Sequence, residues 1–556
     1  MNLENTTIVI TGANGLVGIP TIKKCLQENA AHIFAVDINV GKDLKYLAEK
    51  YKNRITIVQT DLTEYSNCKN LFVDTKINYV FHLAGIKGSP IRAKNSPADY
   101  FFPMIMFNTN MIKASFEANV DWFVYTSSVG VYQPADIMVE DDVWKTMPSA
   151  NDWYPGWAKR CGELALETLQ KQYNWNNFTI IRPANIFGEN DNFSPEATVI
   201  ASNIYKLFNS TDVITCWGDG SPKRDFVFAD DVAEAVLDVV RKEVNDVINF
   251  GSGTAVSIKE TLETLVQIYK EIFNQQKIIE YDTSKPNGDL YRCLSIERQT
   301  KYNILPTTPF KTALMRSILS YKRKNRNFDS LFDTGLYVGH VSELLESWDD
   351  FTSTIQHIKK FDKDPDYYRY RNELIGQHGI GSSFPNEIDL DEIGTRRQLI
   401  LENNWEIFQQ WYITSPGQQK GKGLENAHEY FRGIIEKFIP ELYPEISVSK
   451  NNIRFIEQLT IYENNDFILP HRDGNNPGRL CVILIYFSNE WSAEDGGQLV
   501  VKDHYEKLTS INPSLGTYVM LDFSKHNLEH SVTKIKNNAQ RLAYLAFVYN
   551  KEKENE

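Results

Sequence analysis

Short apolar runs alternate with amphipathic segments over the first 320 residues. Runs of about five apolar residues predict buried strands, and the longer segments between them predict helices. The predicted strands are residues 7–11, 33–37, 55–59, 79–83, 122–126 and 178–182. Strands that alternate with helices pair in parallel, because each helix carries the chain back to the start of the next strand. We therefore expect residues 1–320 to form an α/β domain with a doubly wound parallel sheet.

The pattern changes after residue 320. A basic, polar run at residues 322–327 predicts a linker, which we place at 321–330, and the end of a solvated helix is an equally good interpretation of it. Residues 331–450 have helical spacing and long aromatic-rich stretches, so we expect them to be mainly helical.

The last part of the chain, residues 451–550, is strand-like. Its apolar runs are residues 453–462, 480–487, 498–501, 517–522 and 541–548. Strands that follow one another without helices predict an antiparallel sandwich or barrel. The charged and polar residues 551–556 predict a disordered tail. We therefore expect a second, α+β domain in which helices flank the barrel.

The composition is that of a large globular protein. A chain of 556 residues is too long for one hydrophobic core, so two or more domains are expected. The net charge of −13 disfavours nucleic acid as the main partner. No apolar run reaches the roughly 18 residues of a membrane span, and the first residues lack a signal-peptide pattern, so we expect a cytoplasmic protein without a membrane partner. The six cysteines form no paired motif, which disfavours a disulfide framework or a structural zinc.

A glycine-rich segment directly follows the first predicted strand. Gly12, Gly15 and Gly18 would let the backbone turn tightly and approach a pyrophosphate, which the N–H groups at the start of the next helix stabilise. Asp37 ends the second strand, where a carboxylate accepts hydrogen bonds from the ribose hydroxyls of NAD. Asp61 follows the third strand, where its side chain could meet the adenine. Together these residues predict a Rossmann-like NAD site.

Six further motifs in chain order carry a family resemblance. They are residues 81–85 (FHLAG), 125–132 (YTSSVGVY), 182–188 (RPANIFG), 218–226 (GDGSPKRDF), 230–233 (DDVA) and 249–251 (NFG). With the glycine turn, they make residues 5–320 resemble the extended short-chain dehydrogenase/reductase family of NAD-dependent nucleotide-sugar epimerases, dehydratases and reductases. The resemblance implies NAD as the cofactor, a nucleotide sugar as the substrate and a homodimer as the assembly.

The resemblance also assigns roles to residues that match the family's motifs. Ser128 would hydrogen-bond the sugar oxygen that is oxidised or reduced, and Lys159 would hold the nicotinamide ribose. Asn185, Arg224 and Arg292 would face the nucleotide diphosphate, for which arginine has a forked set of donors. Dehydrating relatives carry an Asp-Glu pair where this chain has Val-Gly after the serine, so epimerisation or keto-sugar reduction is favoured.

The catalytic tyrosine of the family is displaced in this chain. The family places it four residues before the lysine, where Pro155 stands here, and the nearest tyrosine is Tyr154. Five residues of helix turn by about 500°, which would put Tyr154 and Lys159 on different faces. If Pro155 occupies the first helical position, Tyr154 lies at the non-helical cap and a bent entry could bring its hydroxyl into the site. Tyr154 is therefore either the acid/base or a sign of altered or lost chemistry.

The C-terminal part contains candidate metal ligands. His471 and Asp473 are two residues apart and would lie on one face of a strand, and His530 starts a later strand. Two histidines and a carboxylate form the facial triad of non-haem iron(II) oxygenases. His504 and His526 are alternatives for the second histidine, and buried histidines without a metal are the remaining interpretation.

The residues around these ligands carry a second resemblance. Tyr462, residues 496–497 (GG) and Arg541 complete a Y…HxD…GG…H…R order that is similar to the prolyl-4-hydroxylase-like 2-oxoglutarate oxygenases. The resemblance covers residues 450–550 and implies a double-stranded β-helix (jelly-roll) barrel, Fe(II), 2-oxoglutarate and molecular oxygen, with ascorbate as an optional addition. Arg541 would pair with the distal carboxylate of 2-oxoglutarate, and Tyr462 would hydrogen-bond the co-substrate.

Both resemblances together predict a bifunctional sugar-modifying enzyme. One domain would epimerise or reduce a nucleotide sugar with NAD, and the other would hydroxylate a substrate that the sequence does not identify. A glycan or surface polysaccharide pathway would connect the two activities. The alternative is a peptide or prolyl hydroxylase whose N-terminal domain binds NAD or a nucleotide sugar without catalysis.

Overall fold

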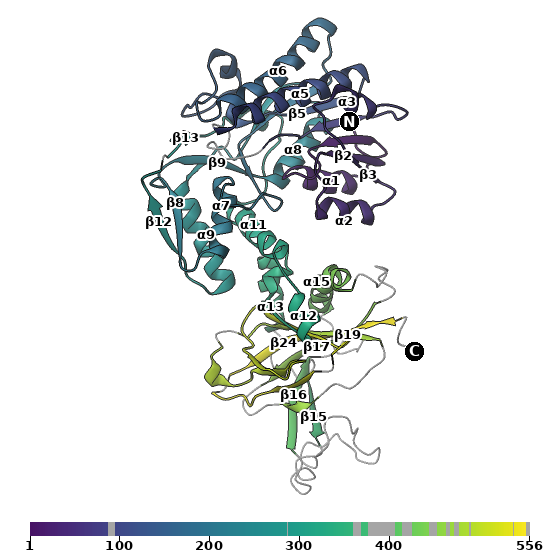
Figure 1. Cartoon of the computed structure of the whole chain (residues 1–556), viewed down its shortest axis with the longest axis vertical. Helices are drawn as coiled ribbons and strands as arrows, with labels where there is room; N and C mark the ends of the chain where they lie inside the picture. The colour runs from purple at the N-terminus through teal and green to yellow at the C-terminus, as the bar shows by residue number, and fades with distance from the viewer. Residues whose placement is uncertain are drawn as a thin grey trace. The chain divides into compact units, whose positions relative to one another are not determined.

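The chain folds into two compact units, Met1–Tyr321 and Lys322–Glu556, each of which is described by itself (Figure 1). This computed structural model describes residues 1–86, 95–285, 287–359, 368–375, 406–413, 425–443, 453–462, 468–471, 478–488, 491–526, 528–537 and 539–551. In this described part of the chain, no helix combines the length and the apolar character that crossing a membrane requires.

The first unit is built on a seven-stranded parallel sheet with the order β10-β6-β5-β4-β1-β2-β3. Its strands are β1 (Thr7–Thr11), β2 (His32–Asp37), β3 (Ile55–Gln59), β4 (Tyr79–His82), β5 (Trp122–Thr126), β6 (Phe178–Pro183) and β10 (Val247–Phe250). The chain winds in one direction from β1 to β3 and in the other from β4 to β10. The sheet confirms the predicted doubly wound α/β fold, in which ligands bind where the direction reverses.

Helices cover both faces of this sheet. They include α1 (Gly18–Gln27), α2 (Lys42–Lys50), α3 (Tyr65–Asn70), α5 (Pro97–Glu117), α6 (Trp153–Tyr173) and α8 (Ala229–Arg241). Ile8 and Ile10 belong to one hydrophobic cluster and Val9 to another, because successive side chains of a strand point to opposite faces. In Figure 1, α5 and α6 lie together along one face of the sheet.

Smaller elements complete the first unit. A four-stranded sheet has the order β11-β9-β13, with β7 paired to β9, and β12 pairs with β8. The elements are η1 (Val129–Val131), η2 (Glu140–Lys145), β7 (Asn185–Phe187), α7 (Val199–Asn209), β8 (Val213–Trp217), β9 (Lys223–Phe228), β11 (Ala255–Ser257), α9 (Ile258–Phe273), β12 (Ile278–Asp282), β13 (Tyr291–Arg292), α10 (Glu297–Lys301) and α11 (Phe310–Lys324).

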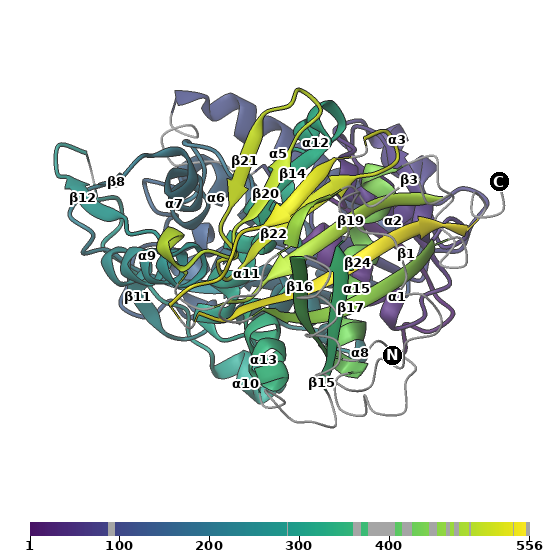
Figure 2. The same ribbon diagram turned by 90° about the horizontal axis from the view of Figure 1, so that it is seen from below.

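The second unit contains two antiparallel sheets. The larger has the order β14-β22-β19-β24-β17-β16-β15, whose strands lie side by side in Figure 2, and the smaller has the order β18-β23-β20-β21. The strands are β14 (Leu336–His340), β15 (Tyr368–Ile375), β16 (Glu406–Ile413), β17 (Ile453–Tyr462), β18 (Ile468–His471), β19 (Arg479–Tyr486), β20 (Leu499–Lys502), β21 (Leu508–Ile511), β22 (Thr517–Asp522), β23 (Glu529–Val532) and β24 (Arg541–Asn550). The other elements are α12 (Asp329–Thr334), η3 (Val341–Glu343), α13 (Trp348–Lys359), α15 (Glu425–Leu442) and η5 (Ala493–Asp495).

The two sheets of the second unit share one hydrophobic core. Leu484 and Val519 of the larger sheet belong to the same buried cluster as Leu499, Val501 and Val532 of the smaller sheet. Antiparallel sheets that bury their inner faces against each other form a sandwich. The arrangement is consistent with the predicted jelly roll.

The described part of residues 331–450 contains strands as well as helices. Helices α13 and α15 agree with the expected helical character, but β14, β15 and β16 from this region extend the larger sheet. Their aromatic-rich sequences fit a strand surface as well as a helix, and the neighbouring strands decide between the two. Lys322–Lys324, part of the expected linker, continue α11, so the helix-end interpretation applies to them.

Candidate active sites

The glycine turn connects β1 to α1 at the carboxyl edge of the parallel sheet. Gly12 has a φ of +67°, which side-chain-bearing residues rarely adopt. A Cβ at Gly18 would overlap the carbonyl oxygen of Gly12, and one at Gly15 would lie 3.0 Å from the same oxygen. The turn is therefore closed by backbone contacts that leave no room for side chains.

Both predicted adenosine-binding carboxylates lie at this edge. Asp37 ends β2 and accepts hydrogen bonds from the N–H groups of Asn14 and Asn39, each at 3.0 Å. Asp61 follows β3 and accepts a hydrogen bond from the N–H of Thr63 at 2.9 Å. A compact glycine turn beside a carboxylate at the end of the next strand fits a dinucleotide, whose phosphates approach the backbone and whose ribose meets the acid.

Lys159 and Ser128 lie on the other side of the glycine turn. The Lys159 side chain reaches back from α6, and its Nζ donates to the carbonyl oxygens of Thr126 at 2.7 Å and Ala84 at 3.3 Å. Burial lowers the pKa of Lys159 to about 8. Ser128 follows β5, and its Oγ accepts a hydrogen bond from the N–H of Gly130 at 3.0 Å. The structure thus brings both residues to the carboxyl ends of β4 and β5.

Tyr154 is not brought to these two residues. Helix α6 begins at Trp153, so Tyr154 is its second residue and Pro155 its third, and the expected cap position of Tyr154 is wrong. Proline is tolerated throughout the first turn, because the N–H groups there lack helical partners in any case. Tyr154 is 40% exposed, and its hydroxyl forms no hydrogen bond with a residue that the structure describes. Regular helix from Trp153 onward places Tyr154 and Lys159 on different faces.

The three predicted diphosphate-binding residues lie on neighbouring strands. Asn185 of β7 donates from Nδ2 to the carbonyl oxygen of Asp225 at 2.8 Å. Arg224 of β9 and Arg292 of β13 are direct partners in the parallel register. Burial lowers the pKa of Arg224 to about 10, and the neighbouring charge of Arg292 acts in the same direction. A half-buried arginine beside a buried one could attract a diphosphate, as far as nearby carboxylates leave their charges free.

Two aspartates that the sequence did not single out hold Arg292. Its Nη2 donates to Asp152 Oδ2 at 2.5 Å and its Nε to Asp289 Oδ2 at 2.9 Å. Burial opposes the charge of Arg292, but the two carboxylates raise its pKa above the ordinary value. Asp152 stands directly before a predicted helix and suggests only a cap, because nothing in the sequence indicates a contact 140 residues away.

The predicted iron ligands lie in the smaller sheet of the second unit. His471 ends β18 and is the register partner of His530 in β23, which places their backbones directly across from each other. The Nδ1 of His530 is 3.3 Å from the carbonyl oxygen of Leu528. A carbonyl only accepts, so this contact places the proton on Nδ1 and the lone pair on Nε2, as in metal-binding histidines.

The third predicted ligand, Asp473, lies outside the described residues. Among the residues that are described, no three His, Cys, Asp or Glu side chains are grouped so that they could hold a metal ion. The backbone register of His471 and His530 leaves the predicted set of two histidines and a carboxylate possible, and such a donor set would suit a non-haem iron(II) ion.

The predicted 2-oxoglutarate residues occupy the larger sheet. Tyr462 ends β17, Arg541 begins β24, and the two are register partners. Arg541 is only 2% exposed, and its Nη2 donates to the Tyr486 hydroxyl at 2.9 Å. A buried guanidinium is a suitable bidentate partner for a carboxylate, so this position fits the keto acid.

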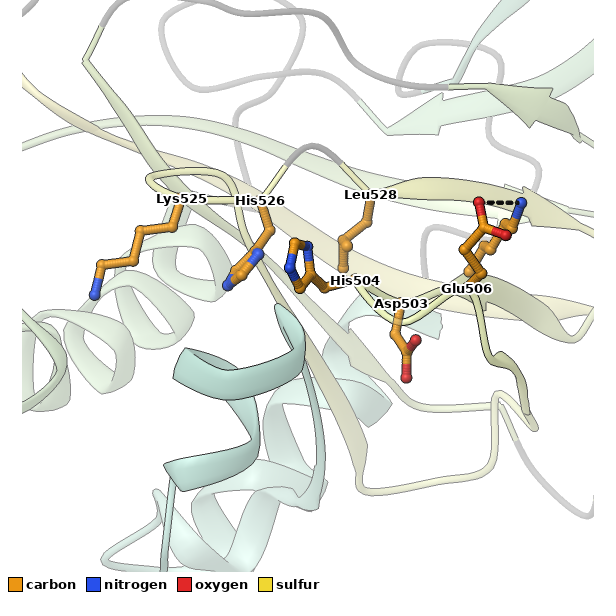
Figure 3. Close-up of a pocket in the computed structure, with 7 residues that line it drawn as sticks. Asp503, His504, Glu506, Lys525, His526 and Leu528 are labelled. Atoms are coloured by element: carbon orange, nitrogen blue, oxygen red, sulfur yellow. Dashed lines mark hydrogen bonds and ion pairs between the residues drawn. The ribbon is translucent and has the colours of Figure 1, made fainter.

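His504 and His526 line a separate small cavity of about 160 Å³ in this unit (Figure 3). Their ring centroids are 4.9 Å apart. Nε2 of His526 is 3.3 Å from the carbonyl oxygen of Phe332. The cavity is lined by Lys502, Asp503, His504, Glu506, Lys525, His526 and Leu528. His530 is not among these lining residues, so the two alternative histidines belong to a different place from the β18–β23 pair.

Comparisons with known proteins divide the chain in the same way. Residues 8–251 match the NAD dependent epimerase/dehydratase family, and residues 457–549 match the 2OG-Fe(II) oxygenase superfamily. GDP-L-fucose synthase 1 of Arabidopsis thaliana is 26% identical over 327 residues, which are 57% of this chain and 93% of that protein. A dTDP-4-dehydro-6-deoxy-D-allose reductase of Streptomyces is 23% identical over 58% of this chain and 97% of its own length.

Among solved structures, UDP-glucose 4-epimerase of Thermotoga maritima with UDP-glucose matches 58% of this chain and all of its own. Its TM-score is 0.51 at 21% identity, a likeness that shows the fold. With the parallel sheet, the glycine turn and the two antiparallel sheets described above, these matches identify both halves. The chain joins an enzyme domain of the NAD dependent epimerase/dehydratase family to an enzyme domain of the 2OG-Fe(II) oxygenase superfamily.

Proposed function

We propose that the N-terminal domain epimerises or reduces a nucleotide sugar with NAD. One observation carries the proposal: a chain of contacts joins the glycine turn to Lys159 and to the strand end before Ser128, two of the three predicted catalytic residues. A Cβ at Gly12 would lie 2.9 Å from the backbone N of Ala84, and Lys159 donates to Ala84 and to Thr126, two residues before Ser128. A nicotinamide whose phosphates lie on the turn would therefore face Ser128.

The residues of this site would divide the work as follows. Ser128 donates a hydrogen bond to the sugar oxygen whose carbon changes oxidation state, and Lys159 holds the nicotinamide ribose. Lys159, with a pKa of about 8, is also a group that can lose a proton near neutral pH. Bound NAD would supply hydride transfer. The names of the relatives, a fucose synthase and a deoxyallose reductase, support a nucleotide sugar as the substrate.

The test is to incubate the full chain with NAD or NADH and a panel that includes UDP-glucose and GDP-L-fucose. Nicotinamide absorbance and chromatography of the sugars report turnover. We expect Ser128→Ala to lower turnover by about 100-fold, because positioned proton donors contribute at least that much. A wild-type chain that binds NAD and alters no nucleotide sugar contradicts the proposal.

We further propose that the C-terminal domain hydroxylates a carbon with Fe(II), 2-oxoglutarate and oxygen. His471, Asp473 and His530 would hold the metal, and Tyr462 and Arg541 would hold the keto acid. The register pairs His471–His530 and Tyr462–Arg541 support this, because each predicted pair is made of direct neighbours on adjacent strands. Bound Fe(II) would supply oxidation of an unactivated C–H bond by molecular oxygen: one oxygen atom would enter the substrate, and the other would enter succinate as 2-oxoglutarate loses carbon dioxide. The hydroxylation substrate would be a sugar or a glycan made from it, in glycan or surface polysaccharide biosynthesis.

Succinate release under oxygen, measured with Fe(II) and 2-oxoglutarate, tests this second activity. Ascorbate is added in parallel, because it would restore metal that has been oxidised. Succinate formation that is unchanged in His471→Ala contradicts the assignment.

A second candidate function is a peptide or prolyl hydroxylase with a non-catalytic N-terminal module. The exposed, displaced Tyr154 favours it, because the family's proton donor has no equivalent at Pro155. Peptide libraries analysed for the added mass of one oxygen atom separate this candidate from the first. NAD binding without sugar turnover, together with a modified peptide, would support it.

A further inference from the structure

The start of α6 packs tightly against the turn that carries Ser128. A Cβ at Gly130 would lie 3.3 Å from the Cβ and Cγ atoms of Asp152 and 3.4 Å from Ser128 Oγ. A Cβ at Gly156, in the first turn of α6, would overlap the carbonyl oxygen of Gly130. Asp152 and Ser128 therefore border the same small space, and the absence of side chains at the two glycines keeps them close.

Asp152 occupies the cap position of α6 without acting as a cap. Its side chain accepts no hydrogen bond from the first turn of the helix. The third helical residue is Pro155, which has no N–H, so one of the two usual donors to a capping carboxylate is missing. The carboxylate is therefore available for another role.

A fixed set of buried groups orients this carboxylate. Arg292, whose side chain is 11% exposed, donates from Nη2 to Asp152 Oδ2, while Asp289 accepts from Nε and Nη2 of the same guanidinium. Asp289 in turn accepts from the Ser149 hydroxyl at 2.8 Å and from Asn151 Nδ2 at 2.6 Å. The Asp152 side chain keeps 21% of its surface exposed, so a bound solute can reach it.

The two neighbouring arginines differ in how their charges are balanced. Two carboxylates balance the charge of Arg292, whereas Arg224 has no ion pair with a residue that the structure describes and donates from Nη1 to the backbone of Lys223. A diphosphate would gain more from Arg224 than from the neutralised Arg292. Arg292 is then a positioning residue for Asp152.

We propose that Asp152 contacts the sugar and selects it by accepting a hydrogen bond from a hydroxyl next to the reacting carbon. A carboxylate accepts hydrogen bonds and cannot donate, so it suits a sugar hydroxyl and repels a phosphate. The proposal rests on the nucleotide-sugar function given above, in which Ser128 meets the reacting oxygen. In this proposal Asp152 and Ser128 bind the sugar, and Arg224 binds the nucleotide.

The test compares a nucleoside diphosphate with the same nucleotide carrying a sugar. Calorimetry of the full chain with NAD gives dissociation constants for GDP, GDP-L-fucose, UDP and UDP-glucose. For the nucleotide sugar that binds, we expect Asp152→Asn to raise the dissociation constant by roughly 10- to 100-fold, the range for a hydrogen bond to a charged group. Binding of the matching diphosphate should stay within about twofold. Arg224→Gln should weaken both ligands equally.

Matched variants separate contact from structure. Asp141→Asn removes an exposed aspartate that is 2.5 Å from Arg298, outside the site, and should change neither constant. Asp152→Glu keeps the charge beside Arg292 but displaces the carboxylate, and should also weaken only the sugar-bearing ligand. NAD binding by each variant reports an intact fold.

The binding constants distinguish failure of the role of Asp152 from failure of the nucleotide-sugar function. Equal losses for diphosphate and nucleotide sugar in both Asp152 variants, or no loss for either, overturn the role of Asp152 and leave the nucleotide-sugar function standing. A wild-type chain that binds NAD but none of the four ligands overturns both proposals.

Discussion

The two candidate sites are specified by different kinds of structure. The N-terminal site is a cradle of backbone, in which three glycines within seven consecutive residues close a turn and leave no room for side chains. The proposed C-terminal site would depend on the register between His471 of β18 and His530 of β23, strands separated along the chain by β19 to β22. A local turn survives most changes elsewhere in the chain, whereas a strand register depends on the packing of a whole sandwich. A side chain added to the glycine turn should therefore weaken binding at the first site, whereas removal of a metal-binding side chain should lower activity at the second.

The largest expected effect is at the register-dependent site. His530→Ala removes one of the two histidines proposed to hold the metal, and we expect succinate formation to fall at least roughly 100-fold, because even outer-shell changes cost about 10- to 100-fold at metal sites. NAD binding by the first unit should be unchanged. His504→Ala is the control, because His504 lines a different cavity. Equal losses in the two variants would contradict the choice of His530.

Overcrowding the backbone cradle should have the next largest effect. A Cβ at Gly18 would overlap the backbone oxygen of Gly12, which cannot rotate away, so Gly18→Ala should weaken NAD binding by about tenfold or more. Fluorescence titration with NADH measures it. Gly433→Ala in α15 adds the same methyl group where nothing lies within 4 Å, and should stabilise the chain by about 0.5–1 kcal/mol. Unchanged NADH binding by Gly18→Ala would mean that the glycine turn does not bind the dinucleotide.

The same contrast explains what the sequence could predict. The parallel sheet and the glycine turn follow from local patterns, since β1 is an apolar run and Gly12 to Gly18 directly follow it. The sequence also named His471 and His530, but only the folded strands make them register partners. Asp152 and Asp289 escaped notice because their importance comes from Arg292, which folding brings to Asp152 from a distant strand. The strands of residues 331–450 were missed because their pairing, not their own pattern, determines them.

A smaller effect should appear in how the stability of the folded chain depends on pH, through the buried Lys159. Burial lowers the pKa of Lys159 from 10.5 to about 8, so above pH 8 the folded protein holds a neutral lysine while the unfolded chain still binds the proton. The unfolded state then binds more protons, and stability rises with pH. Between pH 8 and about pH 9.5, the wild type should gain about 2 kcal/mol relative to Lys159→Met. Urea unfolding of both proteins across this window measures the difference, and parallel curves would contradict the buried position of Lys159.

The smallest expected effect concerns Tyr154, which tests whether the N-terminal site also depends on the placement of a side chain. Its side chain is 40% exposed at the second position of α6, so its hydroxyl lies on another face of the helix from Lys159. We expect Tyr154→Phe to leave sugar turnover within about twofold of the wild type, whereas Ser128→Ala lowers it by about 100-fold. Steady-state rates with saturating NAD and nucleotide sugar measure both. A loss in Tyr154→Phe as large as that in Ser128→Ala would mean that substrate binding rebuilds the first turn of α6. The N-terminal site would then depend on side-chain placement as strongly as the proposed iron site.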